Sequence, residues 1–366
     1  MSLLSELIIL FVVFSINITL LRSLKSLISL EFMKKSTLVN FDKGEFILPI
    51  EKGIRMDLRS IKTFALFCVV ISLCFSCSPC NREDTIIMSE ELFVSHQFTE
   101  PGGFTTGIEG PACDSEGNLY AVNYQRQHTI GIATPDGKCS VFIDLPNGSI
   151  GNGIRFDSKG FMLIADYTNH NILKVNMKTK QISVYAHEPR MYQPNDIAIG
   201  ANDIVYASDP NWSSSTGQMW RIDTDGKVAL LETGMGTTNG IEVSPDEKTL
   251  YVNESVQRNI WAYDLSPKGE ISNKRLLIKF PDYGMDGMRC DVDGNIYVTR
   301  HGKGTVAKLS PKGEVLLEVQ LNGNLCSNLT FGGKDGRTCY VTIADVGNIE
   351  YFRTNLPGRC WKLYHR

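Results

Sequence analysis

The chain has 366 residues, of which 42% are hydrophobic and 21% charged, and its formal net charge is −3. This balance excludes an intrinsically disordered chain, and no cluster of Lys and Arg interleaved with aromatic residues indicates a nucleic-acid partner. The 32 glycines and the many short runs of Val, Ile, Tyr and Phe are typical of an all-β protein with many strands and turns.

The first 80 residues contain two apolar runs. Leu7–Leu21 is interrupted by polar residues and is shorter than the roughly 20 residues that span a membrane as a helix. The second run, Phe64–Phe75, follows the basic residues Arg59 and Lys62 and precedes Cys77. A charged start, an apolar middle and small residues before a processing point are the layout of a secretory signal. A true anchor helix at Leu7–Leu21 is the alternative.

A cysteine directly after an apolar run is similar to a bacterial lipoprotein signal, in which Cys77 would be acylated and become the mature N-terminus. We therefore expect the native protein to begin at Met56. Residues 1–55 would be a non-native or poorly ordered extension, and residues 56–80 a signal peptide of lipoprotein type. This interpretation places the remainder of the chain in the cell envelope rather than the cytoplasm, attached to a membrane through an N-terminal lipid anchor.

A sequence pattern is repeated six times after residue 100. In the fifth copy a polar residue, Asp286, precedes a short strand, Asp293–Asn295 forms a turn, and Ile296–Arg300 forms a second strand. Asp-Gly and Gly-Asn tolerate the positive φ angles that such hairpin turns require. The polar residues that open the copies, here called the lead residues, are 42 to 47 residues apart: Glu109, Asn152, Asn195, Asn239, Asp286 and Asn328. A period of this length is typical of propeller blades, so we predict a six-bladed β-propeller over residues 91–366.

The two ends of the propeller region are expected to meet in one blade. Leu92–Phe98 would supply an outer strand to the blade closed by Arg359–Tyr364, which covers an exposed sheet edge. Cysteines in the propeller do not form a Cys-x-x-Cys pair, so no structural zinc site is indicated. Cys113 and Cys290 are expected to be small buried residues. Whether a pair bridges the last blade is open.

The lead residues should surround the central channel, because each opens the innermost strand of a blade. The loop after each second strand returns to the same face and adds an outer ring of Asn123, Asp166, Asp209, Asn253, His301 and Asp345. Converging carboxylate and amide oxygens are a site for a hard cation such as calcium, magnesium or manganese. The alternative for each single residue is that Asn or Asp satisfies backbone donors in its loop.

Several motifs resemble the senescence-marker-protein (regucalcin) and gluconolactonase family, in the same order and from about residue 100 to 345. They are Glu109-Gly110-Pro111, Pro194-Asn195-Asp196, Asp209-Pro210, Asn239-Gly240 and Asp286-Gly287-Met288-Arg289. The resemblance implies a six-bladed propeller with one catalytic divalent ion at the channel mouth. Such proteins hydrolyse sugar lactones or, in some relatives, organophosphate esters.

The resemblance also implies residue roles. Glu109, Asn239 and Asp286 match metal ligands, and Asn195 matches a residue that binds the metal or the substrate, so the predicted metal set is these four. Asp286 is also the predicted catalytic base. The predicted substrate-binding residues are Asn152, Asp209 and His301. Calcium is the favoured ion, with magnesium, manganese or zinc as alternatives. For Arg289, a salt bridge between blades and a substrate role are both open.

The predicted function is therefore that of a carboxylic-ester hydrolase, a lactonase whose divalent ion polarises the ester carbonyl of a sugar-type lactone. A serine nucleophile is disfavoured because no Gly-x-Ser-x-Gly elbow is present. The alternatives are an organophosphate-ester hydrolase and a non-catalytic propeller that binds a ligand or partner on the same face.

Overall fold

The computed structural model describes residues 39–40, 45–46 and 91–365. The chain divides into two compact units, Met1–Ile86 and Ile87–Arg366. In the first unit the described residues form a short antiparallel pair, β1 (Val39–Asn40) with β2 (Glu45–Phe46). Both predicted apolar runs and Cys77 lie outside the described residues. Among the residues that the structure does describe, no helix is long and apolar enough to cross a membrane.

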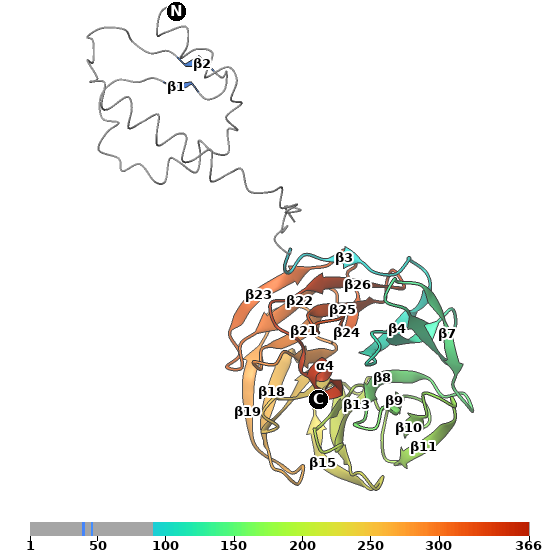
Figure 1. The fold of residues 1–366 in the computed structure, drawn as a ribbon. Coiled ribbons are helices and arrows are strands. Elements are labelled where there is room, and N and C mark those ends of the chain that lie inside the picture. Colours follow the sequence, from blue (N-terminus) through green and yellow to red (C-terminus); the bar gives the residue numbers. More distant parts are fainter. Residues whose placement is uncertain (1–38, 41–44, 47–90, 366) are drawn as a thin grey trace, which may run out of the picture. The chain divides into compact units, whose positions relative to one another are not determined.

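The second unit consists of six four-stranded antiparallel sheets arranged around a central axis (Figure 1). Blade 1 contains β4 (Phe104–Cys113), β5 (Leu119–Tyr124), β6 (Thr129–Ala133) and β7 (Cys139–Asp144). Blade 2 contains β8 (Gly151–Phe156), β9 (Met162–Asp166), β10 (Asn171–Val175) and β11 (Ile182–His187). Blade 3 contains β12 (Ile197–Ile199), β13 (Val205–Asn211), β14 (Thr216–Ile222) and β15 (Val228–Met235).

Blades 4 to 6 follow the same order from the channel outwards. Blade 4 contains β16 (Thr238–Val243), β17 (Thr249–Glu254), β18 (Asn259–Leu265) and β19 (Ile271–Lys279). Blade 5 contains β20 (Met288–Cys290), β21 (Ile296–Arg300), β22 (Thr305–Leu309) and β23 (Val315–Gln320). Blade 6 contains β24 (Cys326–Gly332), β25 (Thr338–Ile343), β26 (Asn348–Arg353) and β3 (His96–Gln97). The predicted six-bladed propeller is confirmed.

Blade 6 joins the two ends of the propeller region. β3 pairs antiparallel with β26, and the amide of Phe98 donates to the carbonyl of Ile349 at 2.9 Å. The expected outer strand from the N-terminal side is thereby confirmed, and it covers the edge of β26. Closing the ring with strands from both ends makes the fold depend on contacts between residues that are far apart in sequence.

The prediction for the C-terminal segment was wrong. Arg359–Tyr364 does not close a blade but forms a short helix, α4, which lies at the centre of the ring in Figure 1. Arg359 forms ion pairs with Glu242 at 3.2 Å and Glu247 at 2.6 Å, and the hydroxyl of Tyr364 accepts the amide proton of Phe156 at 3.2 Å. These contacts join α4 to blades 2 and 4 and hold it at the axis. α4 therefore lies across the end of the channel where first and second strands are joined.

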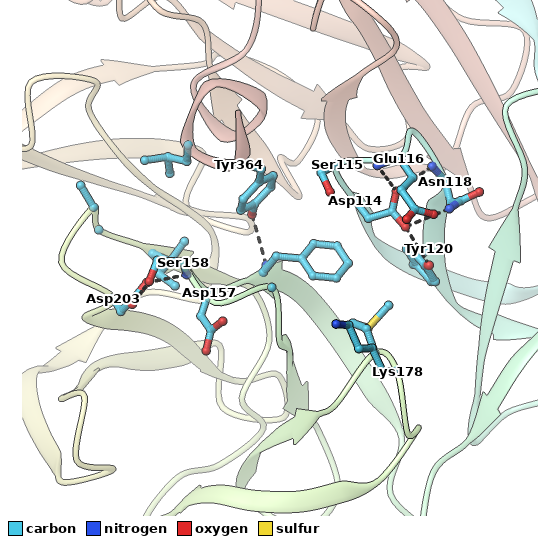
Figure 2. A pocket seen from close by; sticks show the side chains of 17 residues that line it. Asp114, Ser115, Glu116, Asn118, Tyr120, Asp157, Ser158, Lys178, Asp203 and Tyr364 are labelled. Atoms are coloured by element: carbon cyan, nitrogen blue, oxygen red, sulfur yellow. Dashed lines mark hydrogen bonds between the residues drawn. The ribbon is translucent and has the colours of Figure 1, made fainter. Parts of the chain in front are cut away.

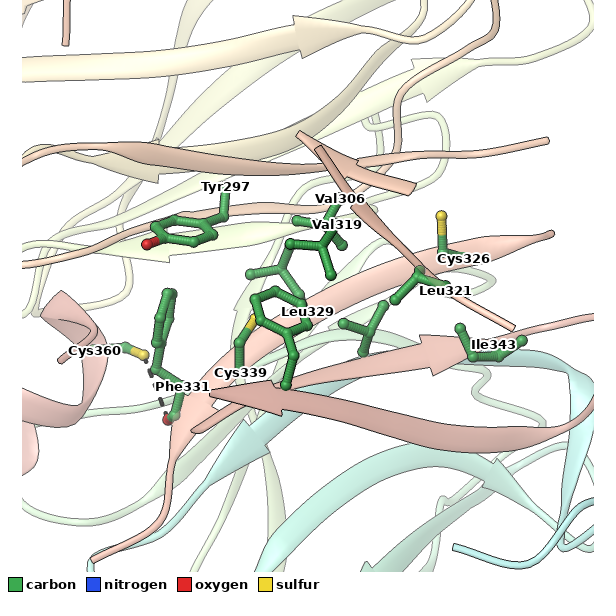
Figure 3. Close-up of a cluster of buried hydrophobic side chains, with 12 residues drawn as sticks. Tyr297, Val306, Val319, Leu321, Cys326, Leu329, Phe331, Cys339, Ile343 and Cys360 are labelled. Atoms are coloured by element: carbon green, nitrogen blue, oxygen red, sulfur yellow. Dashed lines mark hydrogen bonds between the residues drawn. The ribbon is translucent and has the colours of Figure 1, made fainter. Parts of the chain in front are cut away.

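The core is divided among the spaces between neighbouring blades. In the cluster of Figure 3, Tyr297 from blade 5 packs edge-on against Phe331 from blade 6, with a centroid distance of 5.1 Å. Cys339 and Cys360 complete this cluster, and the six cysteines of the described propeller are all free thiols. The distribution of apolar burial between sheets explains how a chain of this length folds without one large core.

The turn between β20 and β21 illustrates how the repeat is encoded. Gly294 has a φ of +84°, which is unstrained for glycine. Asp291 accepts the amide protons of Asp293 at 3.1 Å and Asn295 at 2.9 Å. The predicted turn at Asp293–Asn295 is therefore confirmed, and the structure adds that the Asp291 carboxylate caps it.

Candidate active site at the channel mouth

A pocket of about 310 Å³ lies at the mouth of the channel, on the face opposite α4. Its position follows from the blade repeat, because each lead residue lies within the innermost strand of its blade or within two residues of that strand's start. Five of the six lead residues line it: Glu109, Asn152, Asn195, Asn239 and Asp286. The sixth, Asn328, is fully buried and donates its amide to Glu109 Oε1 at 2.8 Å. The predicted ring is therefore assembled around one cavity.

Three oxygens of the predicted metal set are buried and have no hydrogen-bond donor among the described residues. They are Glu109 Oε2, Asn195 Oδ1 and Asn239 Oδ1. The amide nitrogen of Asn239 donates to Ser255 Oγ at 3.0 Å, so the carbonyl end of this side chain is the end left without a partner. Unpaired buried acceptors are costly and uncommon in native proteins. A cation among these oxygens would remove that cost.

The two acids of the site have raised pKa values. Burial, reinforced by the charge of Asp196, raises the pKa of Glu109 to about 7. Burial also raises the pKa of Asp286 well above its usual range, and the charges of Glu109 and Asp196 add to this effect. Two neighbouring buried carboxylates without a counter-charge on their pocket side are expected to behave in this way. A divalent cation would stabilise both ionised forms.

The donor set fits a hard divalent ion of the calcium type. Two carboxylates would neutralise its charge, and the two amide oxygens of Asn195 and Asn239 would complete the protein's share of an all-oxygen set. No group of three or more His, Cys, Asp or Glu side chains is arranged for metal binding anywhere in the described part of the chain. The candidate site thus differs from zinc or copper centres, which use imidazole and thiolate.

A buried ion-pair network lies beside these residues. Asp196 pairs with Arg289 at 2.9 Å and with Arg155 at 3.3 Å, and all three side chains are almost completely buried. Arg289 does not line the pocket. Of the two roles considered for it, the salt bridge between blades is therefore the one observed. The network connects blades 2, 3 and 5 directly next to the lead residue Asn195.

The predicted substrate residues divide into two groups. Asn152 and His301 line the pocket, and burial lowers the pKa of His301, so that its neutral form is favoured. Asp209 does not line it. Its carboxylate is buried and accepts protons from the amides of Tyr192 and Gln193 and from the side chains of Gln218 and Trp220. Asp209 thus holds the loop before the third lead residue, and the structure does not bring it to the site.

Other residues of the pocket were not singled out from the sequence. Gln127, Tyr167 and Trp212 lie in or beside the loops that join second to third strands. One sequence signal was available, because Trp212 stands in a short serine-rich segment directly after Asp209-Pro210-Asn211. A tryptophan in such a loop has little to pack against within its own hairpin.

A larger pocket of about 600 Å³ lies at the other end of the channel, beside α4 (Figure 2). Two of the acids that line it already accept hydrogen bonds within the surrounding loops. Asp114 accepts protons from Glu116, Asn118 and Tyr120, and Asp203 accepts the amide and hydroxyl protons of Ser158. Size alone therefore does not identify the site, since the unpaired oxygens are at the channel mouth.

Comparison with known families agrees with the motifs. A model of the SMP-30/Gluconolactonase/LRE-like region matches residues 89–345. The chain belongs to this family. Among curated relatives, the gluconolactonase of Zymomonas mobilis is 29% identical over 286 residues, covering 68% of this chain and 79% of the relative. Regucalcin of Sus scrofa is 31% identical over 135 residues, covering 36% of this chain and 45% of the relative.

Solved structures of this family share the propeller. The Xanthomonas campestris gluconolactonase XC5397 has a TM-score of 0.61 and 20% identity, with 72% of this chain and 89% of that chain covered. A luciferin-regenerating enzyme has a TM-score of 0.64 and 22% identity, with 72% and 97% covered. At these identities the likeness concerns the fold. The resemblance of the sequence motifs to the SMP-30/gluconolactonase family is therefore confirmed as family membership, and the predicted six-bladed fold is confirmed as well.

Proposed function

We propose that this protein is a metal-dependent lactonase that opens sugar-type lactones at the channel mouth. The observation that carries the proposal is the convergence of Glu109, Asn195, Asn239 and Asp286 on one pocket, with unpaired oxygens on the first three. Family membership adds support, because relatives of this chain include a gluconolactonase and a 6-deoxy-6-sulfogluconolactonase of Pseudomonas putida, 30% identical over 158 residues. The latter match covers 39% of this chain and 54% of that relative.

The cofactor would be one divalent ion held by these four residues. Calcium is favoured because carboxylate and amide oxygens are its preferred ligands, and magnesium, manganese or zinc are the alternatives. When bound, such an ion supplies Lewis-acid stabilisation of the negative charge that develops on the ester carbonyl oxygen. A relative solved from Agrobacterium tumefaciens is described as a calcium-binding protein, a regucalcin.

The chain's own groups would supply the proton transfers. Asp286 in its ionised form takes a proton from the attacking water, and the water oxygen bonds to the carbonyl carbon. When the ring C–O bond breaks, the leaving alkoxide takes up that proton, giving the open hydroxy acid. Asn195 and Asn239 would position the ion without adding charge. Neutral His301 and Asn152 line the pocket, where they would contact the substrate.

Lactone hydrolysis by the purified protein tests the proposal. We expect turnover of at least one of D-glucono-, D-galactono- and L-gulonolactone, loss of activity after chelation, and its return with calcium. Activity that persists unchanged in chelator would contradict the metal role. No turnover of any lactone with calcium, magnesium, manganese or zinc would instead favour a non-catalytic binding propeller. A parallel assay with an organophosphate ester distinguishes that outcome from an organophosphate-ester hydrolase.

A further inference from the structure

Trp212 differs from the other tryptophans in what surrounds it. Trp220 donates to Asp209 and is fully buried, Trp261 packs against a core cluster, and Trp361 donates to the carbonyl of Gly333. Trp212 is 39% exposed and belongs to no hydrophobic cluster of the described chain. It lines the pocket at the channel mouth. Its indole face is therefore free to contact a ligand.

The loop that carries Trp212 does not need the indole to hold its shape. It joins β13 to β14, and the side chain of Asn211 accepts the hydroxyl proton of Ser213 at 2.7 Å and the amide proton of Ser214 at 3.3 Å. The backbone is thus fixed by polar contacts. An aromatic ring presented by a fixed loop at a pocket is suited to binding, since it loses little conformational entropy.

Two acceptors in the same pocket lie outside the predicted metal set. Asn123 is 3% exposed, and its amide nitrogen donates to the carbonyl of Gly107 at 2.8 Å. Its Oδ1 has no donor among the described residues, and the same is true of Asn152 Oδ1. Because the amide nitrogen of Asn123 is already bonded to Gly107, Oδ1 is the end of this pocket-lining side chain that is left to accept a proton. A hydroxyl group is the neutral donor that would satisfy each oxygen.

A ligand that matches these groups has hydroxyls on its edge and carbon-bound hydrogens on one face. We propose that Trp212, Asn123 and Asn152 form a subsite that selects a polyhydroxylated ring over an unsubstituted or alkyl-substituted lactone. The proposal rests on the lactonase function for its reaction, but the subsite itself is a binding feature. An alkyl lactone would fill the space and leave two buried acceptors unpaired, which penalises it.

Steady-state kinetics with two lactones of the same ring size test this selection. The substrates are D-glucono-1,5-lactone and δ-valerolactone, which lacks the hydroxyls. We expect Trp212→Ala to raise KM for the sugar lactone about tenfold with kcat within about twofold. The variant should change δ-valerolactone turnover much less, because that lactone has no hydroxyls with which Asn123 and Asn152 could hold it against the indole. Trp212→Phe should restore most of the loss because an aromatic face remains. Asn152→Ala and Asn123→Ala should reduce the preference for the sugar lactone, with thermal unfolding measured to verify folding.

A matched control uses an exposed aromatic residue in the loop that leads from β11 to β12. Tyr192 is 42% exposed and does not line the pocket. Tyr192→Ala should leave both substrates unaffected. If Trp212→Ala has wild-type KM for both lactones, or if it impairs both equally and Trp212→Phe does not restore the sugar lactone, the subsite is refuted.

Calorimetric titration with D-glucono-1,5-lactam, in the presence of calcium, separates the subsite from the reaction. The lactam resists hydrolysis, so its binding does not depend on catalysis. Binding that weakens about tenfold in Trp212→Ala supports the subsite. If this occurs but no lactone is turned over, the lactonase proposal fails while the subsite stands. If the wild-type protein does not bind the lactam, the subsite is refuted whatever its activity.

Discussion

Glu109 in blade 1 lies close enough to Asp286 in blade 5 for its charge to raise the pKa of Asp286, beyond the larger effect of burial. The two acids come from positions 177 residues apart, at equivalent points of two blades. Bringing two carboxylates together in a buried pocket is unfavourable for the folded chain unless a cation or a proton compensates them. Several consequences of this arrangement can be measured.

Removing one of these carboxylate charges should weaken metal binding and stabilise the metal-free protein. We expect Asp286→Asn to lower kcat/KM for a sugar lactone at least about 100-fold, because it removes a ligand and the proposed base together. Glu109→Gln should weaken calcium binding at least about tenfold, and at saturating metal it should retain a higher kcat than Asp286→Asn. In chelator, both variants should unfold at a higher temperature than the wild type. Calorimetry, kinetics and thermal unfolding measure these effects, and wild-type metal affinity in either variant would contradict the site.

The metal-free protein should lose stability as the pH rises through the range in which Glu109 titrates. Its folded pKa of about 7 lies above the usual value of 4.5, so the folded state binds the proton more tightly between these values. The stabilisation is complete below about pH 4.5 and is lost by about pH 7, on the order of 3 kcal/mol. The charged neighbours that set this pKa are Asp196, which raises it, and Arg289, which lowers it.

Urea unfolding between pH 4.5 and 8 in chelator measures this dependence. Other carboxylates also titrate, so the quantity to compare is the difference between wild type and Glu109→Gln at each pH. That difference should favour the variant increasingly as the pH rises and should shrink with saturating calcium. A difference that does not change with pH would show that Glu109 titrates normally.

The blade repeat made much of the site accessible from the sequence. The lead residues share one position in every blade, so one correctly assigned blade placed Glu109, Asn195, Asn239 and Asp286 on one face. The turn residues between the first and second strands, such as Asp293-Gly294-Asn295, marked where each hairpin bends. Neither conclusion required knowledge of contacts between blades.

What could not be obtained from the sequence depended on such contacts. Asp209 and Asp286 are both acids in blade loops. Only the three-dimensional structure shows that the Asp209 carboxylate already accepts hydrogen bonds from backbone and side-chain donors. Arg359–Tyr364 is too short for a periodicity to distinguish helix from strand. Identifying Trp212 as a pocket residue required knowing which loops reach the pocket. Each of these depends on partners distant in the sequence.

The ion pairs of Asp196 should dominate stability around the channel. We expect Asp196→Asn to lower the free energy of unfolding by about 3–5 kcal/mol, because two buried arginines lose their shared counter-charge. Arg126→Ala breaks an exposed ion pair with Asp144 and should cost less than about 1 kcal/mol. Chemical denaturation of both variants gives the comparison. Equal, small effects would mean that the network contributes little to holding blades 2, 3 and 5 together.

The targeting prediction concerns residues outside those described and rests on the sequence around Cys77. We expect the mature chain to begin at Cys77 with a diacylglyceryl group, because only Ser76 separates this cysteine from the end of the apolar run Phe64–Phe75. A diacylglyceryl group provides more than one acyl chain, which is sufficient for stable membrane attachment.

Expression in a bacterial host, followed by membrane fractionation and mass spectrometry of the N-terminus, tests this expectation. Cys77→Ser should remain unprocessed, and Cys80→Ser is the control that should not change the processing. An unmodified wild-type chain that starts at residue 1, or one cut elsewhere and recovered without membranes, would contradict the lipid anchor. The pocket residues would keep their proposed roles in that case, since all of them lie within the propeller that the structure describes.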